Sequence, residues 1–240
     1  MTQPVTRRER LRAETLLEIQ TTARKLLVAE GWDGLSLRAI ARAMGMSAPA
    51  LYRYYASRED LVAALVTALK VEMAETLEQA RDAAPDLTGK LLECSRAFRA
   101  WAVAHPAEFT LVFASPAMGL NRPPLDKVND TEDRFSGVFG ALITELFLTR
   151  PFPIPADDEI EPALAEQLTA WCDKFPVPVP IGLTQVFLSC WIRLYGVVSM
   201  EAFYQLEFAL NDASAMFEAE LRDLARLLDV EDRYYPPKKA

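Results

Sequence analysis

Basic, hydroxyl-bearing and aromatic side chains gather at short spacing between residues 36 and 61. This stretch reads SLRAIARAMGMSAPALYRYYASREDL. Arginine can donate paired hydrogen bonds to a guanine edge, and arginine, serine and tyrosine all donate to phosphate oxygens. The residue types therefore indicate contact with a nucleic-acid surface.

Two short helices joined by a tight turn are predicted to position these side chains. The helices are expected over residues 37–44 and 48–54, capped by Ser36 and Ser47. The turn over residues 45–47 contains a glycine where the chain must reverse, which makes the arrangement a helix-turn-helix. The residues expected to form its small core are Ile40, Ala41, Met44, Met46, Leu51 and Tyr55.

The second helix has the composition of a helix that enters a DNA groove. Its first residues are small, so its N-terminus can approach the major groove, where free N–H groups and the helix dipole favour phosphate. Arg38, on the first helix, is predicted to contact guanine. The basic segment over residues 7–10 is expected to act as an arm that reaches a minor groove or the backbone. The predicted DNA-contacting residues are Ser36, Arg38, Ser47, Ala48, Pro49, Ala50, Tyr52, Arg53, Tyr54 and Arg58.

The charge distribution agrees with a basic module on an acidic body. The chain carries a net charge of −8, but residues 1–60 hold ten basic and seven acidic side chains, a charge of +3. The remaining 180 residues hold sixteen basic and twenty-seven acidic side chains, a charge of −11. Such asymmetry favours a nucleic-acid partner for the N-terminal part.

Helical periodicity extends through the chain and predicts an all-α fold. A helix over residues 10–30 ends at the Gly31–Gly34 segment, and a long helix begins at Arg58 after the cap Ser57. A three-helix head over residues 1–57 and a larger helical domain over 58–240 are expected. Residues 176–180 are predicted to be an extended connection and residues 234–240 to be frayed. Further helices are predicted near 88–104, 106–114, 125–149, 157–175, 182–209 and 214–229, with prolines at their boundaries.

Residues 10–61 resemble the N-terminal domain of the TetR family of bacterial regulators. Tyr55 stands where that family usually has Phe, and Arg58 where it usually has Lys. The resemblance implies a head that binds double-stranded DNA as a homodimer at an inverted repeat, and a larger domain for ligand binding and dimerisation. The matching elements, in order, are Ser36, Arg38, Ile40-Ala41, Gly45-Met46-Ser47, Leu51-Tyr52-Arg53-Tyr54-Tyr55 and Ser57-Arg58-Glu59-Asp60-Leu61.

The C-terminal part resembles one subgroup of that family. Residues 191–196 are similar to a Trp-x-Arg-Leu-His-Gly element, with Tyr195 in place of the histidine, and the run from His105 to Phe109 is similar to the same subgroup. An apolar pocket between helices is the usual form of a small-molecule site. The residues predicted to line it, with burial in an ordinary core as the alternative, are Trp101, His105, Phe109, Phe113, Phe139, Trp171, Phe187, Trp191 and Tyr195.

The predicted helices over 157–175 and 182–209 are the candidates for dimerisation. Leu183, Phe187, Trp191, Leu194 and Val198 form one apolar stripe, and other apolar residues lie outside it. A helix that is apolar on several sides must be covered on several sides. Burial within one subunit is the alternative to a four-helix interface between two subunits.

These observations predict a repressor that an apolar or amphipathic effector releases from DNA, with the helix from Arg58 as the lever. A helical protein-binding adaptor, or a hydrolase or transferase, remains as the alternative. No nucleophile elbow or phosphate-binding loop is present, and the single histidine and three unpatterned cysteines predict no catalytic site, no metal and no cofactor. The N-terminus has no signal-peptide pattern, and the prolines within residues 175–192 should leave too short a helix to span a bilayer. A cytoplasmic location with no membrane partner is expected.

Overall fold

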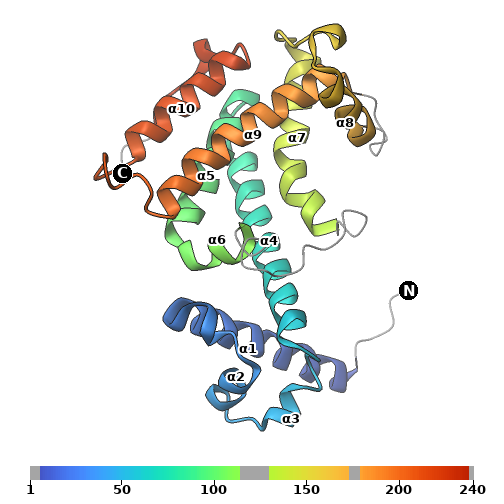
Figure 1. Cartoon of the computed structure of the whole chain (residues 1–240), viewed down its shortest axis with the longest axis vertical. Helices are drawn as coiled ribbons and strands as arrows, with labels where there is room; N and C mark the ends of the chain where they lie inside the picture. The colour runs from blue at the N-terminus through green and yellow to red at the C-terminus, as the bar shows by residue number, and fades with distance from the viewer. Residues whose placement is uncertain (1–5, 114–129, 173–178, 238–240) are drawn as a thin grey trace. The chain divides into compact units, whose positions relative to one another are not determined.

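The computed structural model describes residues 6–113, 130–172 and 179–237, and over these residues the fold is all-α, as predicted (Figure 1). Short 3₁₀ turns lie at Gly31–Gly34, Asp157–Glu159 and Glu231–Arg233. The helices are α1 (Arg7–Glu30), α2 (Leu37–Ala43), α3 (Ala48–Leu51), α4 (Arg58–Ala83), α5 (Leu87–Ala104), α6 (Pro106–Phe113), α7 (Asp130–Thr149), α8 (Pro162–Cys172), α9 (Ile181–Ala202) and α10 (Ser214–Leu227).

Three predicted helices are shorter than expected. α8 begins at Pro162 instead of residue 157, because Asp157–Glu159 forms a separate 3₁₀ turn. α3 ends at Leu51 instead of residue 54, and the following residues continue as turns. α9 ends at Ala202 instead of residue 209, because Tyr204 adopts φ 59° and the Gln205 N–H donates to the Met200 carbonyl (2.7 Å). A residue with positive φ closed by such a hydrogen bond is a common way to end a helix. The predicted residues 125–129 and 173–178, and the prolines at 116, 123 and 124, lie outside the described residues.

The contacts between residues divide the chain into two compact units. The first unit comprises residues 1–72 and 105–131, and the second comprises residues 73–104 and 132–240. α4 belongs to the first unit as far as Glu72 and to the second from Met73 onward. The predicted boundary after residue 57 follows the sequence motif instead of these contacts, and it stays a prediction.

α1, α2 and α3 pack around a small apolar core in the first unit. Met44 and Met46 are only half-buried, because they flank the turn between α2 and α3. The other residues predicted for this core, Ile40, Ala41, Leu51 and Tyr55, are buried, and α1 contributes Ile19, Ala23 and Leu27.

α5, α7, α9 and α10 enclose the core of the second unit. Gly182, near the start of α9, lies so close to the Pro155 backbone that a Cβ atom there would be 2.2 Å from the Pro155 carbonyl oxygen. Only glycine therefore fits at this position. Aromatic rings fill the centre of the bundle, with Phe98 and Phe135 both 5.6–5.7 Å from the Trp191 ring.

The sequence predicted that the prolines within residues 175–192 leave too short a helix to span a bilayer. This prediction was wrong about the length of the helix. The prolines precede α9, which begins at Ile181 and runs for 22 residues. Among the described residues, α9 is the one helix long and apolar enough to cross a membrane. Its residues Leu183, Val186, Leu194 and Val198 are buried in the bundle, so one side of the helix belongs to the core.

The C-terminal segment is held in place as far as Tyr235, so its predicted fraying was wrong for these residues. Arg96 donates to the Tyr235 carbonyl (2.7 Å), and its guanidinium lies over the Tyr234 and Tyr235 rings. Tyr234 Oη donates to Glu218 (2.6 Å), and Tyr235 Oη donates to Glu93 (3.1 Å). These partners come from α5 and α10, so sequence-local reasoning could not find them.

Candidate nucleic-acid interface and ligand cavity

The turn between α2 and α3 has the local geometry of a helix-turn-helix. Ser36 caps α2 by accepting a hydrogen bond from the Ala39 N–H (3.1 Å), as predicted. Gly45 adopts φ 67°, a value that favours glycine, and the Met46 N–H donates to the Ala41 carbonyl (2.8 Å). Ser47 precedes α3 in an extended conformation, but its side chain makes no capping hydrogen bond.

The predicted DNA-contacting residues fall into an exposed group and a half-buried group. Tyr52 is 49% exposed. No ion pair within the described ranges involves Arg38, Arg53 or Arg42, an exposed arginine of α2 that the sequence reasoning missed. The exposed residues are Arg38, Ser47, Pro49, Tyr52 and Arg53, and the half-buried ones are Ser36, Ala48, Ala50, Tyr54 and Arg58.

Arg58 is engaged within the protein. Its guanidinium lies 4.6 Å from the centre of the Trp32 ring, and one Nη donates to the Trp32 carbonyl. At the start of the same helix, the Asp60 N–H donates to Ser57 Oγ (3.0 Å). These contacts tie the N-terminus of α4 to the Gly31–Gly34 turn. Arg58 therefore has a bracing role that its place in the motif did not reveal.

Two tyrosines of the motif are also tied to α1. The Arg12 guanidinium lies 5.3 Å from the centre of the Tyr54 ring. Gln20 Nε2 donates to Tyr55 Oη (3.1 Å), so the hydroxyl that replaces the usual Phe has a partner inside the protein. One face of the Tyr54 ring therefore lies next to the Arg12 guanidinium, and Tyr55 is a core residue.

The basic segment at the N-terminus is helical and is not an extended arm. Thr6 and Glu9 form a reciprocal capping box: Thr6 accepts from the Glu9 N–H (3.3 Å), and Glu9 accepts from the Thr6 N–H (2.7 Å). The backbone and hydroxyl donors of Thr6 lower the pKa of the Glu9 carboxyl. Arg7, Arg8 and Arg10 therefore lie in the first turn of α1, and a minor-groove contact from them stays a prediction.

A partly buried ion-pair cluster in the first unit joins three helices. Arg24 of α1 donates through Nε to Glu108 of α6 (2.9 Å) and through Nη1 and Nη2 to Glu72 of α4 (2.6 and 3.2 Å). Glu108 is only 3% exposed. Burial opposes the charged form of Arg24, but the two carboxylates outweigh this effect and the pKa of Arg24 is raised. The three residues are far apart in sequence, so only the fold brings them together.

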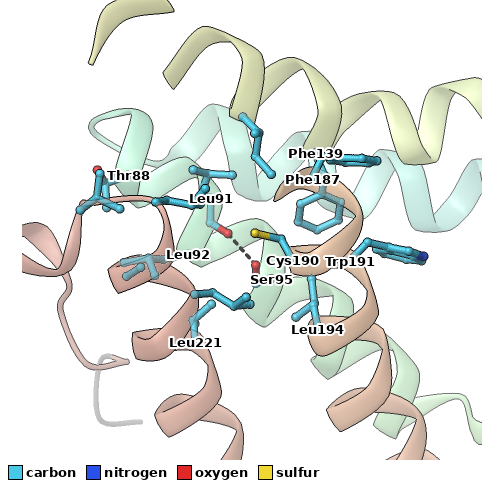
Figure 2. A pocket seen from close by; sticks show the side chains of 15 residues that line it. Thr88, Leu91, Leu92, Ser95, Phe139, Phe187, Cys190, Trp191, Leu194 and Leu221 are labelled. Carbon is cyan, nitrogen blue, oxygen red and sulfur yellow. Dashed lines mark hydrogen bonds between the residues drawn. The ribbon is translucent and has the colours of Figure 1, made fainter. Parts of the chain in front are cut away.

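The second unit contains a cavity lined by residues of α5, α7, α9 and α10 (Figure 2). The centre of a water-sized sphere can move through about 50 Å³ of it. The lining residues are Thr88, Leu91, Leu92, Ser95, Phe139, Ile143, Phe187, Cys190, Trp191, Leu194, Leu221, Leu224, Ala225, Leu228 and Val230.

Three of the nine predicted pocket residues, Phe139, Phe187 and Trp191, line this cavity. Two more stack on its wall from outside: Trp171 on Phe187, with ring centroids 6.3 Å apart, and Tyr195 on Trp191, at 5.7 Å. The other four do not line it: Trp101 is buried in α5, and His105, Phe109 and Phe113 belong to the first unit. The aliphatic and hydroxyl-bearing lining residues were missed because they carry no signal that separates them from ordinary core residues.

Comparison with known families identifies the class of protein. The family described as bacterial regulatory proteins, tetR family, matches residues 19–65, and the family described as Tetracyclin repressor-like, C-terminal domain, matches residues 91–224. The second match covers more than half of the chain. The chain therefore belongs to the TetR family: it is a transcriptional regulator with a DNA-binding helix-turn-helix, and not an enzyme.

Individual relatives agree with this assignment. The chain is 31% identical over 230 residues to the HTH-type transcriptional regulator Rv1816 of Mycobacterium tuberculosis, a match that covers 93% of this chain and 96% of the relative. The crystal structure of the protein SCO4313 is similar, with a TM-score of 0.72 and 32% identity over 91% of this chain and 98% of that one. A TetR family transcription regulator from Marinobacter aquaeolei VT8, with a TM-score of 0.60 and 14% identity over 92% of this chain and 97% of that one, supports the fold alone.

Proposed function

We propose that this protein is a dimeric repressor that binds an inverted-repeat operator and is released from it by an apolar or amphipathic small molecule. The observation that carries the proposal is the exposed arginine set on the helix-turn-helix. Arg38, Arg42 and Arg53, hereafter the recognition face, have no ion-pair partner within the described residues. Arginines without carboxylate partners are available to phosphates and base edges.

The predicted DNA-contacting residues have separate roles in this proposal. Arg38 contacts a base edge, because it is exposed and its guanidinium can donate paired hydrogen bonds to guanine. Tyr52 and Arg53 follow α3 directly and contact phosphates. The half-buried Tyr54 and Arg58 position the face through their contacts with Arg12 and Trp32.

α8 and α9 form the dimer interface in this proposal. Ile192 is 66% exposed, and Met200 is also exposed. Gly196 lies between them at four-residue spacing, and a Cβ atom there would meet no atom within 4 Å. An apolar stripe with a gap at its centre suits the close approach of a second helix, and two such helices can meet across a two-fold axis.

Effector binding acts through the cavity of the second unit. A ligand lowers DNA affinity only by as much as it prefers the conformation that binds DNA poorly. In this proposal α4, which belongs to both units, is the lever that carries a change around the cavity to the head. We place the protein in the cytoplasm, where its DNA and effector are both accessible.

The experiment that tests this function is selection of binding sites by the purified protein from a random duplex pool, repeated at several salt concentrations. The expected result is an enriched inverted repeat, bound by two chains, with affinity that falls steeply as salt rises. An enriched site without two-fold symmetry would overturn the dimer geometry. No enrichment by folded protein would overturn operator binding and favour the adaptor alternative, and transcription raised by the protein at its own site would overturn the repressor role.

A further inference from the structure

The cavity of the second unit has an uncharged lining. None of its fifteen described lining residues is Asp, Glu, Lys, Arg or His. Its polar side-chain atoms are Thr88 Oγ1, Ser95 Oγ, Cys190 Sγ and Trp191 Nε1. An ionised group moved into such surroundings loses its hydration without gaining an opposite charge, which costs several kcal/mol at least.

Thr88 Oγ1 has no hydrogen-bond partner within the described part of the chain. Thr88 is only 2% exposed, so bulk water does not satisfy its hydroxyl. A buried hydroxyl without a partner typically costs about 1–3 kcal/mol. A ligand oxygen in the cavity would remove this penalty, so Thr88 marks the place where the ligand's polar group belongs.

Ser95 Oγ is already occupied, and Cys190 Sγ is neutral, as is the Trp191 indole. Ser95 Oγ donates to the Leu91 carbonyl (2.8 Å), as the dashed line in Figure 2 shows. Burial raises the pKa of the Cys190 thiol to about 12, so this group carries no charge near neutral pH. None of the three groups offers a charge to a ligand.

Thr88 and the aromatic residues of the lining lie at different ends. Figure 2 shows Thr88 at one side of the cavity and Phe139, Phe187 and Trp191 at the other. The open space of about 50 Å³ is several times the roughly 10–15 Å³ that one water molecule requires. The cavity therefore suits a narrow organic molecule with a polar end and a hydrocarbon or single-ring body.

We propose that the effector is a neutral, largely hydrocarbon molecule whose single hydroxyl or carbonyl oxygen bonds to Thr88 Oγ1. This inference rests on the proposed function for its biological meaning, but the binding chemistry can be tested separately. The hydrocarbon body of the effector lies against Leu194 and the aromatic residues. Ligands with a carboxylate, phosphate or ammonium group are excluded.

The test is titration of the full chain with matched eight-carbon probes, 1-octanol and octanoate, by calorimetry at pH 8. 1-Octanol is expected to bind at least about 100-fold more tightly than octanoate, because the lining offers no partner for a charge. Thr88→Val, which keeps the shape and removes the hydroxyl, should weaken 1-octanol binding roughly three- to tenfold, the effect of one neutral hydrogen bond. The matched control Ser95→Ala should change it less.

A hydrocarbon probe separates loss of the hydrogen bond from loss of the fold. Toluene cannot bond to Thr88, so Thr88→Val should bind it as tightly as the parent chain does. Equal binding of octanoate and 1-octanol, no binding of 1-octanol, or an unchanged 1-octanol affinity in Thr88→Val would overturn the inference.

Release of operator DNA is measured in parallel. Thr88-dependent binding of 1-octanol without any effect on DNA affinity would contradict the proposed function and leave the ligand chemistry standing. Release by octanoate alone would contradict the ligand chemistry and leave the proposed function standing.

Discussion

Arginine has opposite surroundings in the recognition face and in the helical bundle of the second unit. Arg38, Arg42 and Arg53 are exposed, and no carboxylate pairs with them within the described residues. In the bundle, Arg96 bonds to Glu218 (2.9 Å), Arg99 to Glu201 (2.6 Å) and Arg193 to Glu220 (2.9 Å). The same side chain serves an external partner in one region and joins helices in the other.

The difference shows that the surroundings of an arginine decide whether it is available to bind DNA or joins helices within the protein. A paired, half-buried guanidinium has its hydrogen bonds satisfied inside the protein, so removing it affects stability. An exposed guanidinium without a partner adds little to stability and remains available to DNA. Substitutions in the two sets should therefore change different measurements.

Arg24 sharpens the comparison, because it lies in the first unit and yet is a bracing arginine. Arg24→Ala leaves the buried Glu108 carboxylate without its partner, so the free energy of unfolding should fall by about 3 kcal/mol or more. Urea unfolding measures this change. Glu108→Gln in the Arg24→Ala background should recover part of the loss, and no loss in the single variant would contradict the bracing role.

Arg38→Ala should show the opposite pattern. Operator affinity is expected to fall by about 1–3 kcal/mol with relaxed base preference at one position, because a base-edge contact is lost. The free energy of unfolding should change by less than about 0.5 kcal/mol, as for other exposed positions. Fluorescence anisotropy with the selected operator and its single-base variants measures the first effect. A uniform loss on all sequences would assign Arg38 to phosphate instead.

Glu218 provides a pH test of the bracing network. Burial alone would raise its pKa, but hydrogen bonds from Arg96 and Tyr234 outweigh burial, and the net shift is downward from 4.5. A lowered pKa in the folded state gives stability that is complete above the ordinary value and lost as pH falls below it. The free energy of unfolding of Glu218→Gln should therefore be lower by about 1 kcal/mol near pH 7. It should also decline less steeply between neutral and acidic pH.

Thermal unfolding followed across that pH range measures the decline. Glu166→Gln, at an exposed position of α8, is the matched control and should keep the slope of the parent chain. If the stability of Glu218→Gln falls with pH as steeply as that of the parent chain, the network does not favour the charged form of the Glu218 carboxylate.

Tyr52→Phe should have the smallest effect. Loss of one hydroxyl contact to phosphate is expected to weaken binding by about 0.5–1.5 kcal/mol on operator and random DNA alike. Unfolding should be unaffected, because Tyr52 is exposed. A loss confined to the operator would show that Tyr52 reads a base.

The sequence predicted the local elements well and the cavity poorly. Ser36, Gly45 and Ser57 mark helix boundaries through hydrogen bonds and backbone conformations that involve only near neighbours, and the structure places the boundaries there. For the cavity, the sequence reasoning selected mainly aromatic residues, whereas most of the lining is aliphatic. Burial against a cavity and burial against another side chain leave the same pattern in a sequence.

The sequence by itself determined the all-α class, the helix-turn-helix and its exposed basic face, because caps, turns and periodicity act over a few residues. Tertiary structure alone decided that Arg24 meets Glu72 and Glu108, that Arg96 holds the C-terminal segment, and that Thr88 faces a cavity. These contacts join residues that are distant in the chain. Their formation depends on how helices pack, and helix packing is set by the whole core and not by any local stretch.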